Sequence, residues 1–184
     1  MGLAALTEED LPHYTYEDYV LWEGRWELIK GIPYAMVPMP ALRHQELCQN
    51  IAVQLVQALE DCRYCKAYLP VDWQIDEDTV VQPDNLVICG KDIGGEKLTE
   101  TPVLVFEILS PSSTRKDRFI KFTLYENEGV KYYCIVDPES SSVEVFGLID
   151  KKYQKIGAYT KGKMTFDIEK CSFDFDFDKL FEYW

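Results

Sequence analysis

The chain has 184 residues, 47% of them hydrophobic and 14% aromatic, so it can bury a sizeable core, and we expect one globular domain spanning residues 1–184. Its formal net charge of -13 argues against binding nucleic acid through one broad basic surface, but it allows an acidic site that metal ions neutralise. No apolar run approaches the roughly 20 residues that span a bilayer, and the first residues lack the pattern of a signal peptide, so we expect a cytoplasmic protein with no membrane segment.

The N-terminal part of the chain predicts a short helix, a β-hairpin and a long helix. A capping-type pattern starts at Thr15, and Lys30-Gly31 is typical of a tight turn between strands. Glu27 interrupts an apolar strand, where on its own it would face solvent. His44 lies in the first turn of the long helix, where a histidine is usually solvated or hydrogen-bonded locally. The expected elements are a helix at 16–22, strands at 25–29 and 32–37, a helix at 41–61, and a strand at 67–75 interrupted at Pro70.

Two short apolar runs in the middle of the chain predict buried strands. Residues 85–89 and 103–108 have the length and β-branched content of such strands, and the polar residues 90–102 between them predict a loop. Asp84 stands just before the first strand, and Glu107 stands near the end of the second. If the two strands pair antiparallel, these carboxylates lie at the same edge of the sheet, within reach of a single ion.

Glu107 is energetically unusual inside an apolar strand. Burying an ionised carboxylate without a partner costs several kcal/mol or shifts its pKa. A metal ion, a lysine or backbone donors must therefore compensate for its burial. The alternative is a structural ion pair, or an edge strand on which Glu107 faces water.

The chain after Glu107 predicts a helix over 115–128 and then a series of strands. Ser110-Pro111 favours extended backbone, and the hydroxyl groups that follow can cap the helix. Asp117 and Lys121 are four residues apart and share one helix face; the alternative is an exposed ion pair of little energetic consequence. The expected core side of this helix is Phe119, Ile120, Phe122 and Leu124. The expected later elements are strands at 132–136, 143–149, 153–158 and 164–168, then an extended Phe/Asp tail and a short terminal helix.

Six cysteines are scattered through the chain: Cys48, Cys62, Cys65, Cys89, Cys134 and Cys171. Cys62 and Cys65 form a C-x-x-C pair, but no second pair or nearby histidine completes a zinc set in the sequence. We expect all six to be structural, because a reduced cysteine behaves as a small hydrophobic residue. The alternative is a cysteine-based metal or redox site at the C-x-x-C pair.

Glu27, Asp84, Glu107 and a nearby lysine together form a plausible set for phosphodiester hydrolysis. Two or three carboxylate oxygens suit Mg²⁺ or Mn²⁺. A lysine beside such a site can orient or deprotonate the attacking water, and the metal can stabilise the charge that develops on phosphate oxygens.

Six segments, found in order over nearly the whole chain, carry a resemblance to a known family. They are RWELIKG at 25–31, LRHQEL at 42–47, VVQPDNLVI at 80–88, VFEILSPSS at 105–113, DRFIKFTLY at 117–125 and GVKYYCIVDPE at 129–139. Together they resemble the "putative restriction endonuclease" family, a branch of the PD-(D/E)xK nuclease superfamily formerly catalogued as a domain of unknown function. The resemblance implies an α/β fold with a mixed sheet: a restriction-endonuclease-like core with flanking helices and added β-hairpins, and its site at one edge.

The resemblance also implies roles for individual residues. By matching positions, Asp84 is the acidic residue of the PD element and Glu107 is that of the second element. Glu27 matches an upstream acidic position, so the implied metal ligands are Glu27, Asp84 and Glu107. The possible supporting residues around them are His44, Gln82 and Asp117.

The catalytic lysine departs from the superfamily pattern. The position two residues after Glu107 is Leu109 and not lysine. The resemblance implies that the following helix supplies this lysine, with Lys121 at the matching position and Lys116 and Arg115 as competitors. The catalytic set is then Asp84, Glu107 and Lys121.

The leading hypothesis is an Mg²⁺- or Mn²⁺-dependent endonuclease that acts on nucleic acid, with DNA as the expected substrate and a homodimer as the expected assembly. The alternative is a catalytically silent relative that has kept the fold as a protein- or nucleic-acid-binding module.

Overall fold

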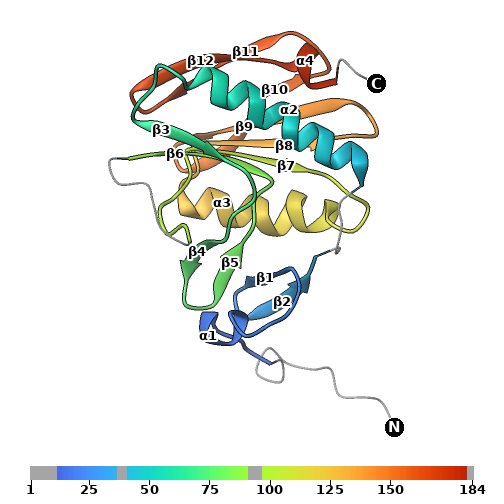
Figure 1. Cartoon of the computed structure of the whole chain (residues 1–184), viewed down its shortest axis with the longest axis vertical. Coiled ribbons are helices and arrows are strands. Elements are labelled where there is room, and N and C mark those ends of the chain that lie inside the picture. The colour runs from blue at the N-terminus through green and yellow to red at the C-terminus, as the bar shows by residue number, and fades with distance from the viewer. Residues whose placement is uncertain (1–11, 37–40, 91–96, 182–184) are drawn as a thin grey trace.

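The computed structural model describes residues 12–36, 41–90 and 97–181, and a six-stranded sheet runs through its middle (Figure 1). The strands of this sheet are β3 (Cys65–Tyr68), β6 (Asn85–Cys89), β7 (Leu104–Ile108), β8 (Tyr132–Asp137), β9 (Ser142–Ile149) and β10 (Lys152–Tyr159). Their spatial order is β10-β9-β8-β7-β6-β3. β7 and β8 are parallel and the other neighbouring pairs are antiparallel, so the sheet is mixed, as the sequence predicts.

Two smaller sheets and several helices complete the described structure. One small sheet has the order β2-β1-β5-β4 and the other is the hairpin β11-β12, with strands β1 (Trp26–Ile29), β2 (Ile32–Ala35), β4 (Trp73–Asp76), β5 (Thr79–Val81), β11 (Lys163–Ile168) and β12 (Cys171–Asp176). The helices are α1 (Tyr16–Tyr19), α2 (Leu42–Ala58), a π-helix (Lys116–Lys121) that runs into α3 (Phe122–Glu128), and α4 (Phe177–Phe181). Within the described ranges, no helix is both long and apolar enough to cross a membrane.

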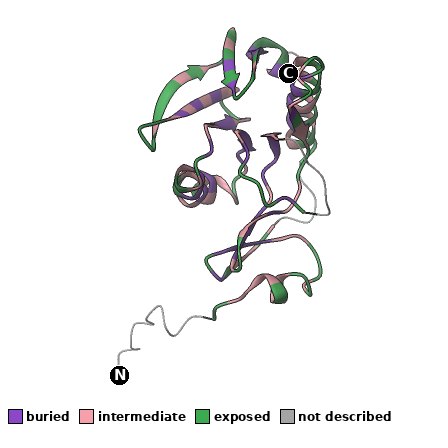
Figure 2. Cartoon of the chain, turned by 90° about the vertical axis from the view of Figure 1, so that its left-hand side faces the viewer, coloured by how far each residue is buried: buried purple, intermediate pink, exposed green. Residues whose placement is uncertain are grey.

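The six-stranded sheet separates two hydrophobic cores. Figure 1 shows α2 and the β11-β12 hairpin on one side of the sheet and α3 on the other. Successive side chains of a strand point to opposite faces, so Phe106 packs in the core under α2 while Val105 packs in the core with α3. The central strands are the most deeply buried part of the molecule, as the purple ribbons in Figure 2 show.

Most expected elements are present close to their expected bounds. The strand at 85–89 and the long helix that becomes α2 are confirmed. Lys30 and Gly31 both have positive φ, 51° and 73°, as a tight hairpin turn between right-handed twisted strands requires. The Phe/Asp tail forms β12 and α4, which confirms the expected extended segment and terminal helix.

Three expected elements differ from the structure. The first helix covers only Tyr16–Tyr19 of the expected 16–22. The expected strand at 67–75 is two strands in different sheets, β3 and β4, because Pro70 cannot donate to a strand ladder and the chain changes sheet there. The helix expected over 115–128 begins as a π-helix. Parts of two expectations, residue 37 of a strand and residues 91–96 of a loop, lie outside the described residues.

The expectation that all six cysteines are unpaired structural residues is wrong for four of them. Disulfides join Cys62 to Cys171 and Cys65 to Cys89, over sequence separations of 109 and 24 residues. Such separations give no local sequence pattern. Cys48 and Cys134 are free and buried, as expected of small hydrophobic residues.

Candidate active site

The start of β6 and the end of β7 lie side by side at one edge of the six-stranded sheet. The two strands pair antiparallel with Asn85 opposite Phe106, which places Asp84 and Glu107 next to each other. The backbone N–H of Ile108 donates to Oδ2 of Asp84 at 2.8 Å and fixes this carboxylate across the strand pair. The antiparallel pairing on which the expected meeting of these carboxylates depends is therefore present.

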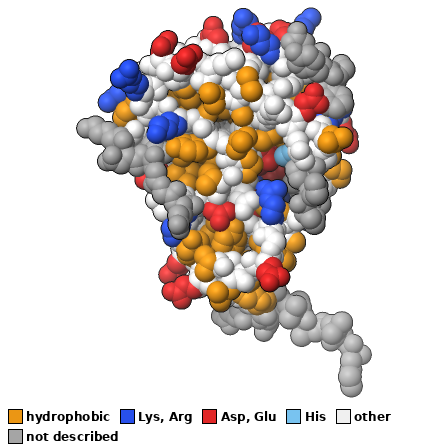
Figure 3. Space-filling model, viewed as in Figure 1, with side chains coloured by type: hydrophobic (Ala, Val, Ile, Leu, Met, Phe, Trp, Pro, Cys, Tyr) orange, Lys and Arg blue, Asp and Glu red, His pale blue; other side chains and the backbone are white. Residues whose placement is uncertain are grey.

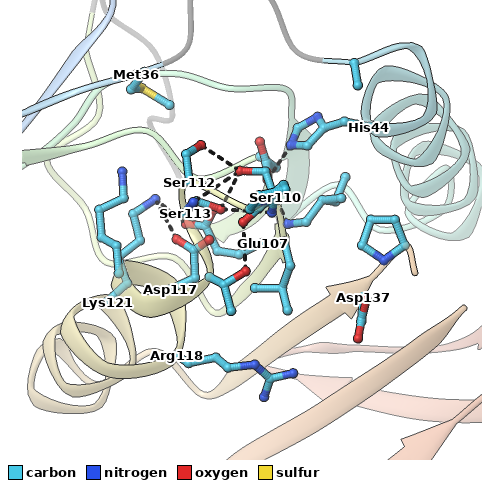
Figure 4. A pocket seen from close by; sticks show the side chains of 18 of the residues that line it. Met36, His44, Glu107, Ser110, Ser112, Ser113, Asp117, Arg118, Lys121 and Asp137 are labelled. Carbon is cyan, nitrogen blue, oxygen red and sulfur yellow. Dashed lines mark hydrogen bonds and ion pairs between the residues drawn. The ribbon is translucent and has the colours of Figure 1, made fainter. Parts of the chain in front are cut away.

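Asp84 and Glu107 line a cleft of about 560 Å³. One wall is the loop that follows β7, where Ser110, Ser112 and Ser113 gather in Figure 4. The side chains of the cleft that can carry charge are Arg25, Arg43, His44, Asp84, Glu107, Lys116, Asp117, Arg118, Lys121, Asp137 and Glu139. The cleft thus combines acidic and basic side chains.

Glu107 is almost completely buried, with 3% of its surface exposed. Its Oε1 accepts hydrogen bonds from Nζ of Lys121 and from the hydroxyl of Tyr125, each at 2.7 Å. Burial raises the pKa of Glu107 well above its usual range; the charge of Lys121 opposes this, and neighbouring carboxylates add to it. The expected alternative in which Glu107 faces water is wrong, and a lysine compensates for its burial.

Glu27 on β1 is fully buried, so the alternative that it faces solvent is also wrong. Its Oε1 lies 2.6 Å from Nζ of Lys121 and accepts a 2.9 Å hydrogen bond from the backbone N–H of Gln82, while its Oε2 pairs with Lys116. Burial alone would raise the pKa of Glu27, but the two lysines outweigh burial and hold this pKa below its usual value. Glu27 is therefore an ionised anchor for both lysines.

The π-helix explains how two lysines five residues apart reach the same carboxylate. In an α-helix five residues advance about 500°, which would turn the second side chain about 140° away from the first. The i→i+5 hydrogen bonds of a π-helix bring residues five apart onto one face. Lys116 and Lys121, the ends of this helix, both contact Glu27.

The π-helix also corrects two expectations about this segment. Asp117 and Lys121 are buried, 1% and 2% exposed, so the alternative of an exposed ion pair is wrong. Asp117 Oδ1 lies 3.8 Å from Lys121 Nζ, and burial raises the pKa of Asp117. Phe119, expected in the core, is 67% exposed because the wide turn points it outward.

Lys121 is a permanent cation at neutral pH. Burial by itself would lower the pKa of Lys121, but the carboxylates around it, led by Glu107 and Glu27, outweigh burial and hold this pKa well above its usual value. In this protonated form Lys121 can orient a water or stabilise negative charge.

His44 and Gln82 take different positions around the site. His44 Nε2 lies 3.2 Å from Oδ2 of Asp84; burial alone would lower the pKa of His44, but this carboxylate raises it. The side chain of Gln82 turns away to Asp72 at 2.7 Å, and only its backbone N–H reaches Glu27.

Tyr125 belongs to the site but is absent from the sequence-based set. Its hydroxyl contacts Glu107, and it is fully buried. Tyr125 stands four residues after Lys121, on the same helix face, so helical spacing was the pattern that could have identified it.

The two adjacent carboxylates fit a divalent cation. In the described part of the chain, the contacts of Asp84 and Glu107 converge on one oxygen each, Oδ2 and Oε1. The second oxygen of each carboxylate is left for a ligand in the cleft. Carboxylate oxygens are the donors that Mg²⁺ and Mn²⁺ prefer.

The basic side chains of the cleft are a local feature. Figure 3 shows Lys and Arg side chains separated by acidic, apolar and uncharged ones over the face drawn, with no continuous basic surface. This agrees with the net charge of -13. On this face, the cleft is therefore the place where basic side chains can attract phosphate.

Comparison with known proteins supports the family resemblance. Residues 16–168 match the model of the family Uma2, described as "Putative restriction endonuclease". The fold is similar to that of a crystal structure described as a "putative nuclease belonging to DUF820" from Anabaena variabilis, with a TM-score of 0.73, 16% sequence identity, and coverage of 92% of this chain and 98% of that chain. No curated protein sequence matches this chain significantly. The mixed α/β, nuclease-like fold predicted from the sequence is confirmed.

Proposed function

Because this chain belongs to the "Putative restriction endonuclease" family, we propose that it is a metal-dependent nuclease whose centre is Asp84, Glu107 and Lys121. One observation carries this proposal: two carboxylates on neighbouring strands open on one cleft, with a buried lysine 2.7 Å from one of them. Asp84 and Glu107 would hold Mg²⁺ or Mn²⁺. When bound there, the cation would supply Lewis-acid stabilisation of the charge that develops on phosphate oxygens.

The residues of the chain would divide the remaining tasks. The Ile108 N–H and His44 orient Asp84 and keep one of its oxygens turned into the cleft. Lys121, protonated and anchored by Glu27, lies beside Glu107 and orients the attacking water near the phosphate. A fixed cation costs no reorganisation during the reaction, which is the advantage of burying it in a carboxylate network.

Glu27 and Lys116 could take either of two arrangements, with Glu27 as a metal ligand or as the anchor of the lysines. Matching positions make Glu27 a third metal ligand, yet Lys121, Lys116 and a backbone N–H already engage both of its oxygens. We propose that Glu27 acts first as the anchor of the two lysines, and ligates metal only if Lys116 moves to the substrate phosphate.

The finer parts of the proposal concern the substrate and the assembly. We propose DNA as the substrate, bound in the cleft between Arg25, Lys116 and Arg118, whose cationic groups match phosphate. We also propose that two copies act together as a homodimer in the cytoplasm.

A catalytically silent binding module is the second candidate function. The net charge of -13 and the engagement of both lysines by Glu27 favour it, because neither helps to attract a polyanion. The two candidates differ in one measurable property, since only the nuclease requires a metal ion for turnover.

The test is titration of Mg²⁺ and Mn²⁺ into the protein by calorimetry, followed by cleavage assays on labelled double-stranded DNA, single-stranded DNA and RNA. Asp84→Asn keeps the size of the side chain but removes its charge, so we expect it to abolish metal binding and to lower cleavage by about 100-fold or more. The control is Asp174→Asn on β12, an exposed carboxylate bonded to Thr165, which should behave as the wild type.

Wild-type protein that binds nucleic acid but neither binds metal nor cleaves any of the three substrates would support the binding module instead. Equal cleavage by Asp84→Asn and the wild type would remove Asp84 from the active site.

A further inference from the structure

Four cysteines from three separate parts of the chain meet at the end of β6 that is remote from Asp84. Cys89 ends β6 and lies opposite Cys65 of β3 in the strand register, while Cys62 lies in the connection between α2 and β3. Cys171 begins β12. The sulfur atoms of Cys62, Cys65 and Cys171 lie within 4.8 Å of one another, and Cys89 is bonded to Cys65. We call these four residues the cysteine cluster.

We propose that the cysteine cluster binds a zinc ion when its thiols are reduced, and that the two disulfides are the oxidised form of the same site. Four thiolates around tetrahedral zinc, each with a Zn–S distance of about 2.3 Å, have their sulfur atoms about 3.8 Å apart. The sulfur atoms of Cys62, Cys65 and Cys171 already lie within 4.8 Å of one another, and that of Cys89 is bonded to Cys65. After reduction, side-chain rotations would bring the four sulfur atoms to the spacing of a zinc site. This proposal does not depend on the nuclease function.

The ligand pattern suits zinc. Cys62 and Cys65 form a C-x-x-C pair, the spacing with which many zinc sites begin. The other two ligands come from β6 and β12, so folding and not sequence completes the set. Four thiolates and one zinc ion carry a net charge of about -2.

Both basic and acidic residues stand beside the cluster in the sequence, with Asp61 directly before Cys62. Arg63 and Lys66 each follow a cysteine of the C-x-x-C pair, and Lys170 precedes Cys171. The amino group of Lys170 lies 4.3 Å from the centre of the Tyr64 ring, which holds this cation next to the same connection.

The conversion between the two forms balances with a dithiol reductant. Two equivalents of dithiol reduce the two disulfides to four thiols and become two disulfides themselves. Zinc then binds the four thiols and releases up to four protons. In a reducing compartment the thiol form is the one expected to persist.

The site is distinct from the nuclease centre and its role is structural. Asp84 and Cys89 are five residues apart along an extended strand, which is about 17 Å at the usual rise per residue. Four protein ligands leave no open position on tetrahedral zinc, as in other structural sites. The ion would fasten the β11-β12 hairpin to β3, the edge strand of the six-stranded sheet.

The first test is the zinc content of the wild-type protein, purified with a phosphine reductant and analysed by mass spectrometry of metals. We expect one zinc per chain. Replacement of zinc by Co²⁺ should give the intense thiolate-to-cobalt absorption of a tetrahedral sulfur site. Alkylation mapped by peptide mass spectrometry should find the four cluster thiols protected by zinc and modified after chelation.

The matched variants are Cys171→Ser and Cys89→Ser against Cys48→Ser and Cys134→Ser, because the latter two cysteines are buried and free. We expect Cys171→Ser and Cys89→Ser to lose zinc, whereas Cys48→Ser and Cys134→Ser should keep it. Asp84→Asn should keep it too. If a cluster variant does not fold, the cobalt spectrum and the alkylation map of the wild type decide the question.

Reduced wild-type protein that holds no zinc, and takes up none when zinc is added, would overturn the proposal. So would zinc that survives in both Cys171→Ser and Cys89→Ser, since the ion would then lie elsewhere.

Discussion

Lys121 is the residue on which the charge balance of the candidate active site depends. Its Nζ lies within 2.7 Å of carboxylate oxygens from two different sheets, Glu27 at 2.6 Å and Glu107 at 2.7 Å. Burial raises the pKa of both carboxylates, but the two lysines hold the pKa of Glu27 below its usual value, whereas Lys121 only partly opposes burial at Glu107, whose pKa stays raised. A metal ion bound beside Glu107 would oppose the effect of burial, because a cation favours the ionised form of a carboxylate.

We predict that Lys121→Met separates catalysis from metal binding. Methionine keeps the apolar stem but removes the charge, and a buried carboxylate pair left without its cation costs about 3 kcal/mol in the free energy of unfolding. Cleavage should be lost, whereas the affinity for Mn²⁺ measured by calorimetry should be kept, because Asp84 and Glu107 remain. Urea unfolding measures the loss of stability.

Lys116→Met is the matched comparison. Its side chain is 13% exposed and pairs only with Glu27 among the described carboxylates, so its removal should cost about 1 kcal/mol. If Lys121→Met cleaves like the wild type and Lys116→Met does not, Lys116 is the catalytic lysine and the assignment made here is wrong.

The candidate residues could be found from the sequence, but their partners could not. Asp84 and Glu107 stand out because each flanks or interrupts a short apolar strand, where a carboxylate is costly. The contact of Glu27 with Lys116 joins residues 89 positions apart on different elements, and no local pattern encodes it. The orientation of Gln82 likewise depends on Asp72 and Tyr19, which only the fold brings near.

At the scale of elements, the π-helix contains one residue more than an α-helix would need to place its first and last side chains, Lys116 and Lys121, on one face. The extra residue is Phe119 or a neighbour, since Phe119 is the one turned to solvent. The wide turn leaves the backbone carbonyl of Asp117 to accept a 3.0 Å hydrogen bond from the hydroxyl of Tyr133. π-turns of this kind occur frequently at functional sites.

We predict that the π-helix tolerates deletion of Phe119 while α3 does not tolerate deletion of Thr123. Without Phe119, Lys116 and Lys121 stand four residues apart in an α-helix and still share one face, so the free energy of unfolding should change by about 1 kcal/mol or less. Deletion of the exposed Thr123 instead rotates the helix by about 100°, which takes Leu124 or Tyr125 out of the core and should cost about 4 kcal/mol.

Urea unfolding and cleavage assays on the two deletion variants provide the measurement. Equal damage from both deletions would show that the wide turn itself is needed, and not only the positions of its flanking residues. Phe119→Ala, which keeps the chain length, should match the wild type in either case.

The π-helix shows where the spacing of apolar residues no longer predicts which face of a helix is buried. Apolar spacing identified the helix over 115–128 and its C-terminal end, because α3 obeys the 3.6-residue repeat and Gly129 adopts a left-handed φ of 82°. The inserted residue broke that repeat at Phe119, so the expected core face was wrong there. In the sequence, a one-residue insertion is visible only as a position at which the expected helical repeat of buried residues is broken.

At the scale of the whole molecule, β6 connects the two proposed sites. Asp84 precedes it at the cleft, and Cys89 ends it in the cysteine cluster. The fold class was implied by the resemblance of six sequence segments to a known family. No sequence pattern predicted that β4 and β5 join β1 and β2 in a separate sheet. This grouping depends on pairing between strands about 50 residues apart, such as Leu28 with Val80.

We predict that the molecule unfolds steeply at alkaline pH, because several tyrosines are buried on the α3 side of the sheet. Burial raises the pKa of Tyr125, Tyr133 and Tyr153 above the usual 10.0. The unfolded chain releases these protons near pH 10 while the folded chain keeps them. Their contribution to stability is therefore complete below pH 10 and is lost as the pH rises above it, by about 1.4 kcal/mol per pH unit for each group.

Tyr133→Phe tests this prediction at a fully buried tyrosine. At pH 7 the variant should lose about 1 kcal/mol of stability, because the Asp117 carbonyl loses its hydrogen bond. Between pH 10 and 11 the stability of the variant should fall less steeply than that of the wild type, and the two slopes should differ by about 1.4 kcal/mol per pH unit. Phe166→Leu, in the other core and without a phenol, should lower stability at every pH and leave the slope unchanged. Urea unfolding at half-unit pH steps, with tyrosinate absorbance recorded on the same samples, measures both quantities. An unchanged slope in Tyr133→Phe would mean that this phenol ionises in the folded protein, and the packing of the α3 core described above would then be incorrect.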